Sequence, residues 1–224
     1  MPLSALYYPK GTEEKPIAFE SLFIPAIYHE IYYDAVYLDI VNQLKNTKKK
    51  EDVTIVDLGA NCGIVTQYLR EFGNVYSVEP SSEHFEALKE NKRFNKWDNV
   101  KLYNYAIADK DGEMTIHHNV DNLTCNSLVL KFAHETESKV KTKKLTSFFR
   151  EAGIKHVDFM KFDVEGAEDI ILPSADFKKA SKMIDCIEIE FHFPDFPKHI
   201  NRLIKMGYTA RRYNCSAVVV AFHR

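Results

Sequence analysis

From Val53 onward, short apolar runs alternate with segments in which apolar residues recur every three or four positions. The apolar runs predict buried strands over 53–58, 74–78, 100–107, 157–163 and 183–193. The periodic segments predict helices over 64–72, 82–94, 167–172 and 198–206. Strands that alternate with helices in this way are typical of strand-helix-strand units. The pattern therefore predicts an α/β fold with a doubly wound, mostly parallel, Rossmann-like sheet.

Two pairs of shorter segments depart from this alternation. Residues 208–213 and 217–222 predict an antiparallel hairpin at the carboxy-terminal edge of the sheet, joined through Asn214. Residues 113–117 and 139–143 predict a second antiparallel pair around a polar loop over 119–127. This second pair is expected to be an insertion at the sheet edge or over a site.

The first 50 residues follow a different pattern. Four prolines, at positions 2, 9, 16 and 25, prevent a long helix before about residue 25. Residues 26–44 then show helical spacing, and a polar, lysine-rich stretch follows over 46–52. We expect a helical arm or lid over 1–50 and a single α/β domain over 51–224.

Composition narrows the class of protein. Hydrophobic residues make up 45% of the 224 residues and charged residues 28%, which excludes fibrous and largely disordered chains. The net charge of -2 shows no basic excess, so a nucleic-acid partner is not expected. No apolar run approaches the roughly 18 residues of a membrane span, and no secretory signal is visible. Four widely spaced cysteines indicate thiols and not a disulfide framework, and we expect a cytoplasmic protein.

The clearest local signal is the turn after the first strand, VDLGANCG over 56–63. In open parallel sheets this turn borders the ligand crevice, and glycine lets the backbone approach the ligand. Asn61 stands where a dinucleotide fingerprint needs its second glycine, so NAD is disfavoured. Glu79 ends the second strand and could accept hydrogen bonds from both hydroxyls of a ribose.

These motifs resemble those of the FkbM family of class I S-adenosylmethionine-dependent methyltransferases. The resemblance runs from about Val53 to His192 and includes SVEPSSEHFEALKEN (77–91), YAIADKDGEMTI (105–116), NSL (126–128) and FMKFDVEGAEDIIL (159–172). It implies a S-adenosylmethionine site formed by Asp57, Gly59, Ala60, Asn61, Gly63, Glu79, Pro80, Asn104, Ala106, Ile107 and Asp163. Asp57 would hold the methionine end, Glu79 the ribose, and the residues after the third strand the adenine. Family members resemble O-methyltransferases that act on hydroxyls of sugars and secondary metabolites.

Charged residues gather toward the carboxyl ends of the last two parallel strands. On one face of each strand, apolar residues give way to Lys161, Asp163 and Glu165 and to Glu188, Glu190 and His192. Unpaired charge costs several kcal/mol in a sheet that is covered on both faces. Either these side chains pair with one another as the strand tips reach water, or they line the cleft that holds the cofactor. Lys161 alone is interpreted as structural. Glu168 either only favours the dipole of the next helix or also faces the substrate.

For methyl transfer to a hydroxyl, the second interpretation makes His192, Asp163, Glu190 and Glu165 the candidate catalytic residues. His192 is the expected base because its unperturbed pKa near 6.5 suits neutral pH. No metal is assigned, although Asp163, Glu190 and His192 are an alternative set of ligands for a divalent ion. The expected function is S-adenosylmethionine-dependent O-methylation of a small molecule or a glycan. Two alternatives are a non-catalytic S-adenosylmethionine-binding scaffold and an RNA methyltransferase.

Overall fold

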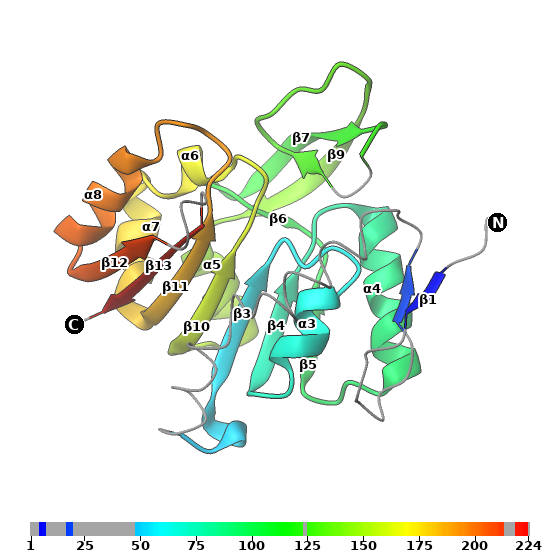
Figure 1. Cartoon of the computed structure of the whole chain (residues 1–224), viewed down its shortest axis with the longest axis horizontal. Coiled ribbons are helices and arrows are strands. Elements are labelled where there is room, and N and C mark those ends of the chain that lie inside the picture. Colours follow the sequence, from blue (N-terminus) through cyan, green and yellow to red (C-terminus); the bar gives the residue numbers. More distant parts are fainter. Residues whose placement is uncertain (1–4, 8–16, 20–47, 123–124, 213–217, 224) are drawn as a thin grey trace.

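Seven strands form the main sheet, in the order β12-β13-β11-β10-β3-β4-β5 (Figure 1). Their bounds are β3 Thr54–Leu58, β4 Asn74–Val78, β5 Val100–Tyr103, β10 Val157–Phe162, β11 Ile184–Glu190, β12 Tyr208–Arg212 and β13 Val218–His223. Neighbouring strands from β5 to β11 are parallel, and β13 is antiparallel to both β11 and β12. The predicted doubly wound sheet and its antiparallel carboxy-terminal edge are therefore confirmed.

The computed structural model describes residues 5–7, 17–19, 48–122, 125–212 and 218–223. Two short strands, β1 (Ala5–Tyr7) and β2 (Ile17–Phe19), form an antiparallel pair near the amino terminus. The predicted helix over 26–44 and the connection at Asn214 lie outside the described residues. Within the described ranges, no helix has the length and apolar character that a membrane span requires.

Helices cover both faces of the main sheet. Helices α3 (Ile64–Leu69) and α4 (Ser82–Asn95) lie on one face, where Ile55 of β3 packs in one core cluster with Leu69 and Leu88. On the other face lie α5 (Leu145–Ala152), α6 (Glu168–Ile171), α7 (Ala175–Ala180) and α8 (Pro197–Lys205). Val56, the next residue of β3, packs in a second core cluster with residues of these helices. Successive residues of a strand point to opposite faces, which explains the near-continuous apolar runs in the sequence.

A second sheet of four strands lies beyond the carboxyl ends of the parallel strands (Figure 1). It has the order β6-β9-β7-β8, with bounds β6 Ala106–Ile107, β7 Gly112–Asn119, β8 Asn126–Ser127 and β9 Glu135–Lys143. The predicted antiparallel pair is confirmed as β7 and β9. The single strand predicted over 100–107 is wrong, because it divides into β5 and β6, which belong to different sheets. Asn104 lies at the break, where its side-chain amide donates to the backbone carbonyl of Glu79 at 2.9 Å.

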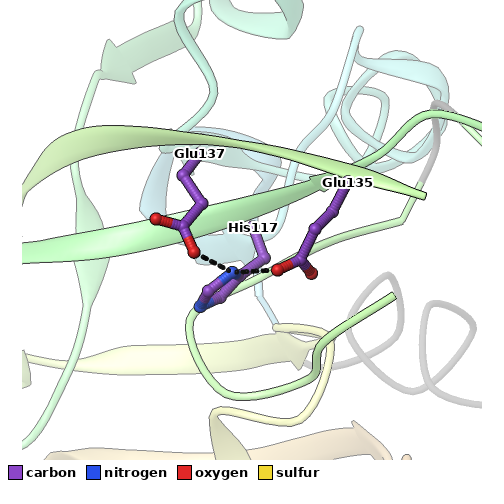
Figure 2. Close-up of side chains that lie close together, drawn as sticks. All are labelled: His117, Glu135 and Glu137. Atoms are coloured by element: carbon purple, nitrogen blue, oxygen red, sulfur yellow. Dashed lines mark hydrogen bonds and ion pairs between the residues drawn. The ribbon is translucent and has the colours of Figure 1, made fainter. Parts of the chain in front are cut away.

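An ion-pair cluster joins β7 to β9 in this insertion. Figure 2 shows His117 of β7 facing Glu135 and Glu137 of β9. The Nδ1 atom of His117 lies 3.1 Å from a carboxylate oxygen of Glu135 and 3.3 Å from one of Glu137. His117 lies directly opposite Glu137 in the register, and its side chain is 9% exposed. Cross-strand contacts between polar side chains stabilise an antiparallel ladder. His117 is therefore part of the insertion's own framework and not the surface residue that its polar surroundings suggest.

Several bounds differ from the prediction. Helices α5 and α7, and the short 3-10 helices η1 (Lys50–Asp52) and η2 (Ser181–Met183), were not predicted. The last parallel strand, β11, ends at Glu190 and not at residue 193, so His192 lies just beyond the strand. Cys62, Cys125 and Cys186 form no disulfide, and Cys215 lies outside the described residues.

Candidate active site

The site lies where the chain order of the sheet reverses. Strand β3 has β4 on one side and β10 on the other, and the chain leaves all three at the same edge. A cavity of about 230 Å³ opens there, between the carboxyl ends of β3, β4, β10 and β11 and the second sheet. Ligands of open α/β sheets bind at such a reversal point.

The turn after β3 forms the floor of this cavity. Gly59 has a φ of 75°, and a Cβ atom there would lie 1.8 Å from the backbone oxygen of Asp163. Glycine is therefore required for the turns after β3 and β10 to approach each other. Ala60 and Asn61 also line the cavity.

Gly63 has a packing role instead of the expected contact with the cofactor. Its φ is 99°, and a Cβ atom there would lie 2.6 Å from Leu88 and 3.0 Å from Trp97. Gly63 lies at the start of α3 and is not among the residues that line the cavity. The absence of a side chain lets α3 lie close to α4.

Glu79 reaches the cavity from the end of β4. It is 4% exposed, and its two carboxylate oxygens accept backbone N–H groups of Asn61 and Ser81, both at 2.8 Å. Burial raises the pKa of Glu79 to about 7, although those two hydrogen bonds act to lower it. A buried carboxylate that lines a cavity and retains acceptor capacity suits a diol ligand. Pro80 lies beside Glu79 on the same wall.

The residues after β5 only partly match the expected adenine site. Ala106 and Ile107 line the cavity together with Tyr105. Asn104 does not line it, because its amide donates to the carbonyls of Glu79 and Pro80, at 2.9 Å and 3.3 Å. Asn104 thus holds the loop that carries Glu79 in place and does not itself face the cavity.

A row of charges crosses three neighbouring strands below the cavity. Lys161 of β10 lies opposite Asp57 of β3 and Glu188 of β11 in the sheet register. Its Nζ donates to the carbonyl of Gly59 and to Asp163, both at 3.1 Å, and lies 3.8 Å from Asp57. Burial acts to lower the pKa of Lys161, but the surrounding carboxylates outweigh burial and raise it. Lys161 therefore remains a cation that holds the two turns together.

Asp57 is fully buried and does not line the cavity. Its carboxylate accepts the hydroxyl of Thr66 in α3 at 2.5 Å, and burial raises its pKa. The expected direct contact with the methionine end of the cofactor is therefore not supported by its position. Asp57 supports Lys161 and the first turn from beneath.

Three of the four candidate catalytic residues meet beside the other end of the cavity, which Asp163 and Glu165 line and His192 does not. His192 Nε2 lies 3.2 Å from Glu165 Oε2 and 3.8 Å from Asp163 Oδ1. Glu190 lines the same cavity. Glu165 has a φ of 50°, in the left-handed region that L-residues rarely adopt, and Gly166 follows with a φ of 95°. This strained turn places the Glu165 carboxylate beside His192.

The environment changes the protonation of both partners. Burial acts to lower the pKa of His192, but the hydrogen bond to Glu168 and the neighbouring carboxylates outweigh burial and raise the pKa to about 9. Burial and the charge of Asp163 raise the pKa of Glu165 to about 7. The expectation of His192 as the base rested on an unperturbed pKa near 6.5, and these surroundings make it a cation at neutral pH.

The structure also brings in residues that the sequence did not single out. His84 of α4 lines the cavity, with its Nδ1 3.2 Å from the amide of Asn126 in β8 and 3.9 Å from Glu79. Ser127 donates to the carbonyl of Glu165 and accepts the N–H of Leu130 at 2.8 Å. The insertion is therefore tied to both ends of the cavity. Its sequence signal was the Asn- and Ser-containing loop.

The cluster of possible metal ligands in the structure differs from the alternative set that the sequence suggested. Asp163, Glu165 and His192 offer ligand atoms within 4.8 Å of one another, so Glu165 takes the place that Glu190 held in that alternative. Carboxylates and imidazole are ordinary ligands of divalent ions. The same atoms are already engaged in the ion pairs described above.

Comparison with known proteins identifies the type of domain. A family model described as the Methyltransferase FkbM domain matches residues 57–210, more than half of the chain. The protein named Methyltransferase 1 of Beauveria bassiana is 25% identical over 177 residues, which cover 69% of this chain and 68% of that protein. The protein named 2-O-methyltransferase NoeI of Sinorhizobium fredii is 24% identical over 153 residues, or 60% of this chain and 62% of NoeI.

Solved structures agree on the architecture. The METTL16 MTase domain superposes with a TM-score of 0.53 at 13% identity, covering 85% of this chain and 67% of that one. An rRNA methylase from Streptococcus thermophilus superposes with a TM-score of 0.50 at 10% identity, covering 82% and 94%. At identities this low, the two likenesses establish the class I methyltransferase fold alone.

Proposed function

The chain belongs to the FkbM family of S-adenosylmethionine-dependent methyltransferases, and from this premise we propose that it methylates a hydroxyl group of a small molecule or a glycan. The observation that carries the proposal is a single cavity with two chemically different ends. Glu79 follows β4 at one end and Glu190 belongs to β11 at the other, where Glu165 also lies, with the Gly59 turn and Asp163 side by side between them. The name of the relative NoeI, a 2-O-methyltransferase, supports oxygen as the acceptor atom.

The first end suits S-adenosylmethionine. The backbone of the Gly59 turn lines the cavity, and Glu79 offers a buried acceptor for ribose hydroxyls. Ile107 and Leu128 supply apolar walls for an adenine ring. When bound, the cofactor supplies an activated methyl group on a sulfonium, which leaves as a neutral thioether after transfer.

The second end suits proton removal from an acceptor. As the acceptor oxygen bonds to the methyl carbon, the hydroxyl proton must leave, and a positioned base accelerates such a step by about 10²–10⁴. We assign the base to Glu165, because a carboxyl with a pKa of about 7 is ionised slightly above neutral pH and still accepts a proton well. His192, as a cation, keeps the ionised form of Glu165 in place. Asp163 and Glu190 would orient the acceptor.

An acceptor screen tests this proposal. The purified chain is incubated with isotopically labelled S-adenosylmethionine and a panel of hydroxylated metabolites, free sugars, oligosaccharides and ribosomal RNA, and labelled products are identified by mass spectrometry. We expect a labelled methyl group bound to an oxygen of one class of small molecule or glycan. Glu165→Gln and His192→Ala should each lower turnover by about 10²–10⁴ and leave S-adenosylmethionine affinity nearly unchanged.

Other outcomes would contradict the proposal in separable ways. Label in RNA alone, with strongly salt-dependent binding, would make the chain an RNA methyltransferase. Cofactor binding without any labelled product would favour the scaffold. We expect turnover to survive chelation and dialysis, because the proton is assigned to Glu165. A loss of activity that a divalent cation restores would instead support the metal alternative.

A further inference from the structure

Glu168 lies behind the acceptor end of the cavity and contacts His192. It is the first residue of α6, and its side chain is 1% exposed. Its Oε1 lies 3.1 Å from His192 Nδ1 and accepts the backbone N–H of Val164 at 3.3 Å. Its Oε2 is buried and accepts no hydrogen bond within the described part of the chain.

A buried carboxylate needs a nearby proton or cation. Removing an ionised carboxyl from water costs several kcal/mol unless a charged partner compensates. His192 provides that partner through Nδ1, and its other nitrogen, Nε2, then points to Glu165 and Asp163. The imidazole ring therefore bridges a buried carboxylate and the acceptor end.

We propose that Glu168 is a positioning residue that holds the His192 ring in one orientation, with Nε2 toward Glu165 and Asp163. Its catalytic consequence rests on the proposed function, whereas the contact itself does not. Three carboxylates from two elements face His192: Glu168 on α6, and Glu165 and Asp163 on the turn after β10. Of these, Glu168 alone bonds to Nδ1, so it decides which nitrogen faces the acceptor.

The simpler explanation is that Glu168 only favours the amino-terminal dipole of α6. The neighbouring residue provides a matched control for that explanation. Asp169 is also in the first turn of α6, and its carboxylate pairs with Lys198 at 2.9 Å and with His199 at 2.6 Å. Asp169→Asn removes an acid from the same helix turn and breaks a histidine pair, but it leaves His192 untouched.

The test is a pH titration of His192 by NMR in the cofactor-free and acceptor-free protein, with its signals assigned by comparison with His192→Gln. The wild-type pKa is expected near 9. Glu168→Gln should move it by one unit or more toward the unperturbed value of about 6.5, because the amide carries no charge. Asp169→Asn should leave it unchanged. A folded Glu168→Gln variant with the wild-type titration would overturn the proposal.

A second measurement needs no variant. Above the pKa of His192 in the wild-type protein, nitrogen NMR should find the remaining ring proton on Nδ1, where Glu168 accepts it. A neutral ring protonated on Nε2 would overturn the proposal even if Glu168→Gln does not fold. With an acceptor in hand, Glu168→Gln should lower kcat roughly tenfold or more and shift the acid limb of the pH profile upward, with cofactor affinity unchanged. A missing acceptor would contradict the proposed function but leave both NMR results standing.

Discussion

Glu79 is buried, and burial disfavours the charged form of its carboxylate. The pKa of Glu79 is raised to about 7 by burial, so the folded chain holds a proton there that the unfolded chain has lost above about pH 4.5. Because the folded state binds more protons, this group stabilises the fold at acid pH, and that contribution is lost as pH rises toward 7. A ligand that donates hydrogen bonds to the ionised carboxylate would offset the loss.

This predicts a pH-dependent effect of Glu79→Gln on stability and a loss of binding. The amide is uncharged, but its single oxygen cannot replace both carboxylate oxygens that accept the N–H groups of Asn61 and Ser81, so the variant should be less stable than the wild type by ~1–3 kcal/mol at about pH 5. At about pH 8 this deficit should be smaller, because the variant avoids the buried charge. Its S-adenosylmethionine affinity should fall roughly 10- to 100-fold, because hydrogen bonds to a charged acceptor are lost. Denaturant unfolding at the two pH values and calorimetry measure both effects. Equal affinity in the two proteins would remove Glu79 from the cofactor site.

At the scale of elements, the site depends on the close approach of two turns. Gly59 and Asp163 belong to the turns after β3 and β10, and a Cβ atom on Gly59 would collide with the Asp163 carbonyl. We expect Gly59→Ala to lower the free energy of unfolding by about 3 kcal/mol or more, from overpacking and left-handed strain together.

Gly153 supplies the control for that prediction. It ends α5 with a φ of 72°, and a Cβ atom there meets nothing within 4 Å. Gly153→Ala should therefore cost only the strain of about 1 kcal/mol and keep cofactor binding. Denaturant unfolding and calorimetry compare the two variants. Similar costs in both would mean that the turns can separate without loss.

The elements that the sequence predicted correctly are those whose burial leaves a visible pattern of apolar residues. Strands β3, β4, β10 and β11 are buried on both faces, so their apolar runs are visible in the sequence. The break at Asn104 was not visible, because it depends on carbonyls that β4 delivers from 25 positions away. Helix α6 has only four residues, and whether Glu168 faces water or His192 is decided by tertiary packing. Tertiary packing also places His84 in the wall of the cavity, so its position could not be predicted from the sequence.

The residues around the cavity could be named from the sequence, but their electrostatics could not. Glu79 was named from its place after the second strand, and Asp163, Glu165 and Glu190 from the alternation along the last two parallel strands. All four line one cavity. Asp57 and Gly63 lie outside the cavity, because Asp57 bonds to Thr66 of α3 and Gly63 packs against Leu88 of α4. The pKa of His192 could not be foreseen, since it depends on three carboxylates whose convergence only the fold produces.

For the whole molecule, cofactor binding should be measurable as a gain in stability. A ligand that binds only the folded state at about 100 times its Kd adds about 2.7 kcal/mol. For a domain of this size, that corresponds to a rise in Tm of roughly 5–10 °C. We expect such a rise with S-adenosylmethionine and with its demethylated product, and none with NAD at the same concentration. Thermal scans measure it, and a matching rise with NAD would contradict the assignment of the first turn.

The left-handed backbone at Glu165 places function and stability in competition. A glutamate in that conformation costs about 1 kcal/mol, which glycine would relieve at once. Selecting variants of this enzyme for heat resistance alone should therefore enrich glycine or asparagine at position 165, at the expense of the carboxylate. Directed evolution that ignores turnover would therefore give a more stable protein that lacks the proposed base. Position 165 is consequently one to hold fixed in any stabilised version of this chain.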